Sequence, residues 1–208
     1  MAAAAKQKSV SYTVPGMSER EATTVIAILQ DRLDALNDLA LTLKHIHWNV
    51  VGPHFIAVHT MLDPQVDAVR LMVDDTAERI ATLGGSPSGT PGALVQRREW
   101  DDYSLGRDDA IAHMGALDVV YAGIIEAHRD AIEQTEEPDP VTQDMLIAQA
   151  GQLEQFHWFV RAHLEDASGG LATAGARSEK SGARAGAARS TSARSSFARS
   201  SASPRTRR

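Results

Sequence analysis

Residues 44–63 read KHIHWNVVGPHFIAVHTMLD and contain four of the eight histidines in the 208-residue chain. The pair Gly52-Pro53 interrupts this stretch, because glycine permits tight turns and the residue before a proline is biased away from helix. On both sides of the pair, apolar residues recur at steps of three and four, as in helices that bury one face. We therefore predict two long helices joined by a short turn, with imidazole side chains near the junction.

The same periodicity extends outward and predicts an all-α protein without β-strands. Ser18 and Glu21 form a capping box that opens the first helix, which ends near Gly52. Pro64 lies inside the second helix, where we expect a kink rather than a break because the pattern resumes beyond it. Four long helices favour a four-helix bundle, and residues 91–96 could form a short helix between the second and third. The predicted helices cover residues 18–51, 55–83, 91–96, 104–134 and 140–167.

Composition excludes several classes of protein. The chain has no cysteine, so disulfides and thiolate metal sites are excluded. No apolar run approaches the roughly 18 residues that a membrane span needs. The start, MAAAAKQKSV, lacks the apolar core of a signal peptide, so we expect a cytoplasmic protein without membrane contact. Length favours one domain, at residues 18–168, between a flexible arm at 1–17 and a disordered tail at 169–208.

The charge of the chain is divided between an acidic body and a basic tail. Residues 169–208 contain nine Lys or Arg residues and one Glu; they carry +8, which leaves −14 for residues 1–168 of the net −6. Their Ala, Ser, Gly and Arg composition predicts disorder. A flexible cationic tail neutralises phosphates without reading bases, so we predict salt-sensitive binding to double-stranded DNA without sequence specificity. The candidate DNA-binding residues are Arg177, Lys180, Arg184, Arg189, Arg194, Arg199, Arg205, Arg207 and Arg208.

The second predicted helix carries two pairs of possible metal ligands, each spaced four residues apart. His59 and Asp63 form one pair, and Asp74 and Glu78 form the other, so each pair lies on one helix face. The two pairs share a stripe but stand about 16 Å apart, at about 1.5 Å per residue, too far for one ion. An antiparallel twofold packing of this helix about residues 68–69 would bring each pair against the other pair of a partner chain.

His47, at the end of the first helix, could reach the same site across the turn at residues 49–54. Two imidazoles and three carboxylates suit iron, with manganese and zinc as competitors. Spacing alone leaves a structural interpretation open, because a histidine on an apolar stripe is commonly a packed core residue. We expect His45 and His54 to be structural or exposed. A di-iron site inside one bundle is poorly supported, because Glu154-Gln155-Phe156-His157 is the only Glu-x-x-His motif.

These residues together resemble the signature of the Dps proteins, the DNA-protecting mini-ferritins of bacteria. The pattern is K-x-x-H-W-N-x-x-G-x-x-F-x-x-x-H-x-x-x-D at residues 44–63, followed by D-x-x-x-E-R at residues 74–79. The resemblance extends over about residues 18–168. It implies a dodecameric hollow shell of all-α subunits, each a ferritin-like four-helix bundle with a short extra helix between the second and third helices. It also implies an iron ferroxidase centre at each twofold interface, formed by His47, His59 and Asp63 of one subunit and by Asp74 and Glu78 of its partner.

In such a protein, hydrogen peroxide or dioxygen oxidises Fe(II), with peroxide preferred, and ferric oxide is stored inside the shell. Trp48 would lie beside the centre and donate an electron or quench a radical, with aromatic packing as the alternative role. An acidic body would concentrate Fe(II), and candidate pore acids are Asp139, Asp144 and Glu154. We expect a cytoplasmic, nucleoid-associated protein. The alternative is a nucleoid-compacting structural protein whose inter-subunit metal site only stabilises the dimer.

Overall fold

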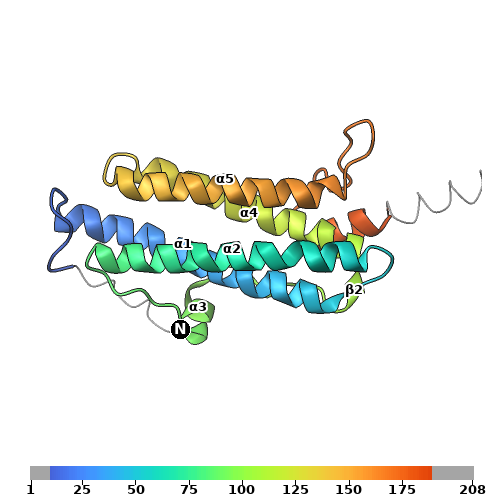
Figure 1. The fold of residues 1–208 in the computed structure, drawn as a ribbon, viewed down its shortest axis with the longest axis horizontal. Coiled ribbons are helices and arrows are strands. Elements are labelled where there is room, and N and C mark those ends of the chain that lie inside the picture. The colour runs from blue at the N-terminus through green and yellow to red at the C-terminus, as the bar shows by residue number, and fades with distance from the viewer. Residues whose placement is uncertain (1–9, 189–208) are drawn as a thin grey trace, which may run out of the picture.

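The computed structural model describes residues 10–188 (Figure 1). Most of the predicted N-terminal arm and the last twenty residues of the chain therefore lie outside the described part. The six predicted DNA-binding arginines from Arg189 onward are among them.

The described chain is a bundle of four long helices, as the periodicity predicts. Figure 1 shows α1 and α2 as one layer and α4 and α5 as the other, with the short helix α3 beside α1. Two core clusters run through the bundle, one around Leu43, Leu62 and Leu117 and one around Leu29 and Ile80. The helices are α1 (Glu19–Asn49), α2 (Phe55–Thr82), α3 (Pro91–Arg97), α4 (Ala110–Thr135) and α5 (Pro140–Ala162), and residues 179–188 are also helical.

Local signals fix the start of α1 and the turn after it. The Ser18 hydroxyl accepts a hydrogen bond from the Glu21 amide at 3.2 Å, and the Glu21 carboxylate accepts one from the Ser18 amide at 2.9 Å. Gly52 has a φ of 97°, and a Cβ there would lie 2.7 Å from an Asp109 carboxylate oxygen. Glycine is therefore required in this turn both by its backbone conformation and by space. The helix α2 continues through Pro64 without a break.

Two expectations for the region before α4 were wrong. Two-residue strands are present, because β1 (Val50–Val51) pairs in parallel with β2 (Asp108–Asp109). This pairing holds residues 108–109 extended beside the α1–α2 turn, so α4 begins at Ala110 instead of residue 104. Its N-cap is Asp109, whose carboxylate accepts a hydrogen bond from the Ile111 amide at 2.9 Å. The last long helix also ends earlier than predicted, at Ala162.

The helix α4 is long and apolar enough to cross a membrane by length and composition alone, with a mean hydropathy of 1.4 over 18 residues. However, 61% of that window is buried inside the molecule. Packing against the other helices accounts for this hydropathy, as in the core helix of a bundle.

The predicted disordered tail is folded over its first half, which corrects the expectation for residues 171–188. Leu171 forms an antiparallel bridge with Glu165, and residues 179–188 form a helix that packs against α4. A Cβ on Gly182 would lie 2.1 Å from the Gly115 carbonyl oxygen, so the two backbones meet directly. A composition rich in small residues predicts disorder, but here the small residues permit this close contact. Thr173 adds a buried hydrogen bond to the Asp118 carboxylate.

Candidate metal centre

The α1–α2 turn places His47 and His59 face to face. The His47 Nδ1 lies 3.0 Å from the His59 carbonyl oxygen, and the His59 Nδ1 lies 2.9 Å from the His47 carbonyl oxygen. The two rings stack with their centroids 3.6 Å apart and their planes at 23°. The Phe55 ring packs against His59 from the other direction, at 4.9 Å between centroids. The last turn of α1 and the start of α2 thus form one rigid pair of imidazoles.

These contacts decide which ring nitrogens are free to bind a metal. A carbonyl oxygen only accepts hydrogen bonds, so Nδ1 of each ring carries the proton and donates it. Nε2 of each ring is the nitrogen left outside this pair of hydrogen bonds, and it is the atom through which such a histidine could bind a metal. The reciprocal hydrogen bonds therefore fix the orientation of both candidate ligands.

Asp63 lies one turn beyond His59 and is kept ionised by Lys44. The Lys44 Nζ lies 2.8 Å from an Asp63 carboxylate oxygen, and this hydrogen bond holds the pKa of Asp63 below its usual value. The His47 Nδ1 lies 3.4 Å from the same oxygen. The structure thus places His47, His59 and Asp63 near one another beside the start of α2, and their role as metal ligands stays a prediction. The motif residue Lys44 is the ion-pair partner of Asp63.

Asp74 and Glu78 lie farther along α2 and are exposed. Since α2 is continuous, the eleven residues from Asp63 to Asp74 span about 16 Å. Within residues 10–188, no three His, Asp or Glu side chains are placed to hold a metal ion together. Nor does any cation of the described chain form an ion pair with Asp74 or Glu78. A single subunit therefore presents an imidazole half and a carboxylate half that do not meet.

Large apolar side chains are exposed beside these two halves. Leu71, three residues before Asp74, is 67% exposed, and Ile56, three residues before His59, is 64% exposed. Trp48, next to His47, is 72% exposed, so packing within the subunit does not account for it. Exposed apolar groups that flank polar ones are typical of protein interfaces.

The remaining histidines of the quoted stretch have no metal-binding arrangement. His45 Nε2 lies 2.8 Å from the Leu105 carbonyl oxygen, so it ties α1 to the segment before α4. His54 is exposed in the turn. Both placements agree with the structural or exposed roles expected from the sequence.

The single Glu-x-x-His motif is engaged in structural contacts. His157 Nε2 lies 2.7 Å from an Asp118 carboxylate oxygen. Burial opposes ionisation of Asp118, but hydrogen bonds from His157 and Thr173 outweigh it and lower the pKa of this carboxyl. Glu154 accepts a hydrogen bond from Arg129 at 2.8 Å. These contacts give both ends of the motif partners within the chain, in agreement with the weak support for a di-iron site inside the bundle.

The three candidate pore acids are in different environments. Asp139 is buried, and Arg79 Nη2 donates to its two carboxylate oxygens at 2.9 and 2.7 Å, which ties the end of α2 to the start of α5. Glu154 is paired with Arg129, whereas Asp144 is exposed on α5. A role for these acids in iron entry stays a prediction.

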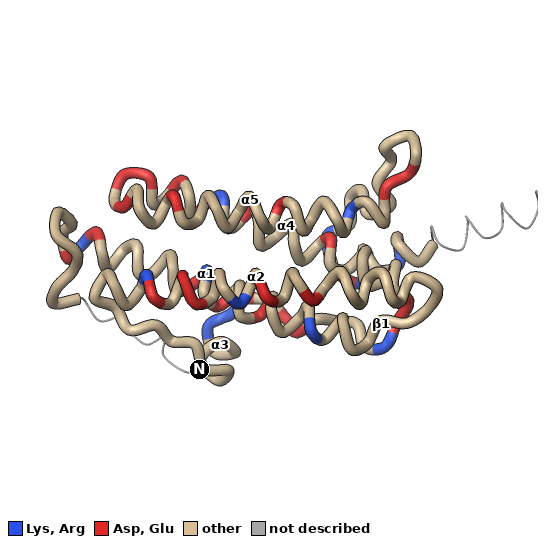
Figure 2. The backbone as a smooth tube through the Cα atoms, in the orientation of Figure 1, with Lys and Arg blue, Asp and Glu red and all other residues tan. Residues whose placement is uncertain are grey.

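Acidic residues outnumber basic ones along the four long helices (Figure 2), whereas the folded segment 171–188 carries three basic residues and one acidic residue, Glu179. Arg177, Lys180 and Arg184 are exposed on the folded segment 171–188. These three cations therefore belong to the folded part of the tail.

Comparison with known proteins agrees with this arrangement. The ferritin-like domain model matches residues 26–169. The DNA protection during starvation protein of Mycolicibacterium smegmatis is 58% identical over 173 residues, covering 83% of this chain and 94% of that protein. The fine tangled pili major subunit of Haemophilus ducreyi is 49% identical over 164 residues, covering 79% and 87%.

A solved structure is similar over nearly its whole length. DpsA14 from Streptomyces coelicolor superposes with a TM-score of 0.78 and is 64% identical, with 79% of this chain and 98% of that chain covered. The family match, the identities and the shared bundle lead to one conclusion. The chain belongs to the Dps family of ferritin-like proteins.

Proposed function

We propose that this protein is a ferroxidase whose active sites form between two chains. The observation that carries the proposal is the division of candidate ligands along α2: His59 and Asp63, with His47 of α1 beside them, lie near its start, and Asp74 and Glu78 lie about 16 Å farther along. An antiparallel pairing of α2 about a twofold axis brings the two halves together twice. The exposed Leu71 near the centre of α2 supports this face as the contact.

The ligand set fits Fe(II) as the substrate. Neutral imidazole nitrogens and carboxylate oxygens are ligands that Fe(II) accepts. In the absence of a metal, Lys44 neutralises Asp63; a divalent cation at the site would compete with this ammonium group for the same carboxylate. Two Fe(II) ions each lose one electron to one hydrogen peroxide molecule, whose O–O bond breaks and which leaves as two waters after taking up two protons. This stoichiometry avoids hydroxyl radical, and dioxygen is the alternative oxidant.

We further propose a closed shell of twelve subunits that stores the ferric product, in a cytoplasmic protein associated with the nucleoid. The acidic body supports the storage role, because acidic surfaces raise the local concentration of cations. The same body repels DNA, so DNA binding is assigned to the basic tail. Trp48 is exposed next to His47 and is placed to contact the partner chain or to donate an electron.

Iron oxidation tests the proposal directly. Peroxide-dependent oxidation of Fe(II), followed by the absorbance of the ferric product, should fall to the background rate in His47→Ala with His59→Ala. His54→Ala is the matched control, because it removes an exposed histidine from the same turn. It should oxidise iron at the wild-type rate.

If the native protein and the double variant oxidise iron equally slowly, the site is structural. The result would then favour the nucleoid-compacting protein with a metal that only stabilises the dimer. Native mass measured for each variant separates loss of chemistry from loss of assembly.

A further inference from the structure

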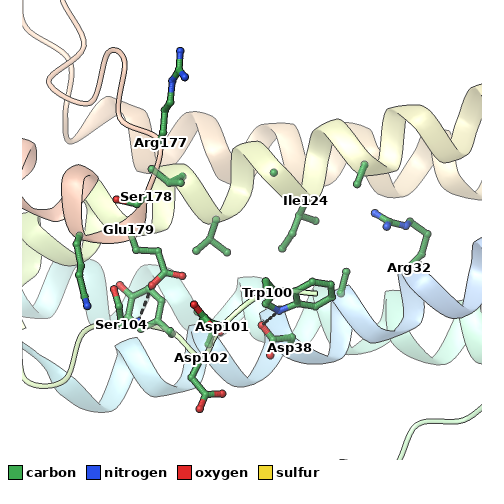
Figure 3. Close-up of a pocket in the computed structure, with 18 residues that line it drawn as sticks. Arg32, Asp38, Trp100, Asp101, Asp102, Ser104, Ile124, Arg177, Ser178 and Glu179 are labelled. Carbon is green, nitrogen blue, oxygen red and sulfur yellow. Dashed lines mark hydrogen bonds between the residues drawn. The ribbon is translucent and has the colours of Figure 1, made fainter. Parts of the chain in front are cut away.

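A cavity of about 780 Å³ lies between α1 and α4 (Figure 3). Its front is covered by the loop at residues 100–104 and by residues 177–180 of the folded tail segment. None of the residues that line it belongs to α2, so it is separate from the candidate metal centre. Its volume falls in the range of pockets that bind small organic molecules.

The α4 side of this cavity is apolar. Val119, Val120 and Ile124 line it, and Figure 3 shows the Ile124 side chain projecting into the space between the two helices. Gly123 lies on the same wall, and a Cβ added there would meet no atom within 4 Å. The cavity therefore has room for an apolar group along α4.

Arg32 provides the cationic end of the cavity. Its Nη1 is buried without a hydrogen-bond partner, and Arg32 forms no salt bridge with the described residues. Burial lowers the pKa of this guanidinium, while the charges of Asp31 and Asp130 oppose that shift. An N–H group that is buried without an acceptor is costly, so it marks a place where a ligand acceptor would be favourable. Figure 3 shows Arg32 at the end of the cavity away from Glu179.

Of the four acids that line the cavity, Asp38, Asp102 and Glu179 are bonded to other groups, whereas Asp101 is exposed. Asp38 accepts hydrogen bonds from Trp100 Nε1 at 2.9 Å and from Arg98 at 3.1 Å. Glu179 accepts one from the Ser104 amide at 2.7 Å. These contacts hold the Trp100 indole and the 100–104 loop in place over the cavity, and they leave the Arg32 guanidinium without an acceptor of its own.

We propose that this cavity binds a monocarboxylate that carries an apolar chain or ring. The carboxylate accepts hydrogen bonds from the Arg32 guanidinium, whose planar geometry matches two carboxylate oxygens. The apolar part lies along Val119, Val120 and Ile124 and is removed from water there. Arg177 and Lys180 also line the cavity, but they come from the segment that carries Glu179, whereas Arg32 is the lining cation with a buried, unsatisfied nitrogen. The apolar wall beside Arg32 favours an apolar chain over a second charged group at that end.

Isothermal titration calorimetry of the full-length protein with octanoate tests this assignment, with octanol as the uncharged comparison. We expect octanoate to bind at least about tenfold more tightly than octanol, because hydrogen bonds to a charged group are involved. Arg32→Gln should remove that preference. Arg20→Gln is the control, since it removes an exposed arginine from the same helix and should leave binding unchanged.

A second variant tests the apolar wall independently. Gly123→Leu adds a bulky side chain on the cavity wall, at a position where the added Cβ meets no atom within 4 Å, and should abolish octanoate binding, whereas the neighbouring exposed Ala122→Leu should not. The proposal is overturned if the wild-type protein does not bind octanoate, or if either Arg32→Gln or Gly123→Leu binds it as well as the wild type does. Native mass and helical circular dichroism of each variant show that the fold is retained.

Discussion

The proposed division of a metal centre between two chains can be tested by mixing two inactive variants. One variant carries His47→Ala and His59→Ala, which removes the imidazole half of each site. The other carries Asp74→Asn and Glu78→Gln, which removes the carboxylate half. Each variant alone should lack ferroxidase activity, because every site in its assemblies is missing one half.

The geometry fixes how much activity mixing restores. Each twofold interface contains two sites, and each site takes its imidazole half from one chain and its carboxylate half from the other. In a mixed pair, one site has both halves intact and the other has neither. Random pairing makes about half of the pairs mixed, so about one quarter of all sites are restored. A site within one chain would restore none, because no chain in the mixture carries both halves.

The assay is the initial rate of peroxide-dependent Fe(II) oxidation, measured after the two variants are co-expressed or reassembled together. Native mass spectrometry must show mixed assemblies, since unmixed ones give no information. An assembly of His54→Ala chains, treated in the same way, sets the rate for intact sites. A rate no higher than that of either variant alone, in assemblies shown to be mixed, would refute the shared site.

Three further predictions concern the tail and the core. Deleting residues 189–208 should abolish retardation of DNA in a gel, because it removes six of the nine tail cations. Iron oxidation should be unaffected, because the deletion spares the folded segment 171–188. Unchanged retardation would contradict the assignment of DNA binding to the tail. Gly182→Val should release segment 171–188, because its Cβ would lie 2.1 Å from the Gly115 carbonyl oxygen. Trypsin should then cleave after Arg177 faster than it does in the wild type. The control is Gly151→Val on α5, where the added Cβ meets no atom within 4 Å and cleavage should match the wild type. Burial lowers the pKa of His128 in the folded protein to about 4. Below about pH 6.5 this histidine therefore takes up a proton in the unfolded protein but stays neutral in the folded one. The protein should lose about 3 kcal/mol of stability as the pH falls from about 6.5 to 4. Urea midpoints at fixed protein concentration should therefore fall less steeply with pH in His128→Gln, and equal slopes would show that His128 does not titrate in this way.

The sequence allowed the bundle and its helix ends to be predicted wherever the signals are local. Ser18 and Glu21 cap α1 through contacts three residues apart. Gly52 permits the turn after α1 because its φ of 97° is a conformation that favours glycine. The start of α4 could not be predicted in this way. It depends on the pairing of Val50 and Val51 with Asp108 and Asp109, more than fifty positions away. The sequence pattern of residues 104–109 alone does not indicate this pairing.

The docking of the first half of the tail was missed for a related reason. A composition of Ala, Gly and Ser usually means that too little apolar area is available to offset the loss of chain entropy. At Gly115 and Gly182 the absence of side chains has the opposite effect, because it lets two backbones approach. The buried hydrogen bond from Thr173 to Asp118 strengthens the same contact. Only the pairing of the two glycines in space, and not the composition of either segment, predicts this result.

The candidate metal ligands could be proposed from the sequence because a helix converts spacing into distance. That conversion gives the positions of the two halves but not the orientation of the side chains or their charge balance. The structure adds that the His47 and His59 rings are oriented by each other's carbonyl groups, and that Lys44 balances Asp63. In the proposed dimer, the carboxylates equivalent to Asp74 and Glu78 would add two negative charges to the site, and neither forms an ion pair within the described chain. Since buried charges are costly unless they are paired, the assembled site has a surplus of negative charge that a divalent cation would relieve.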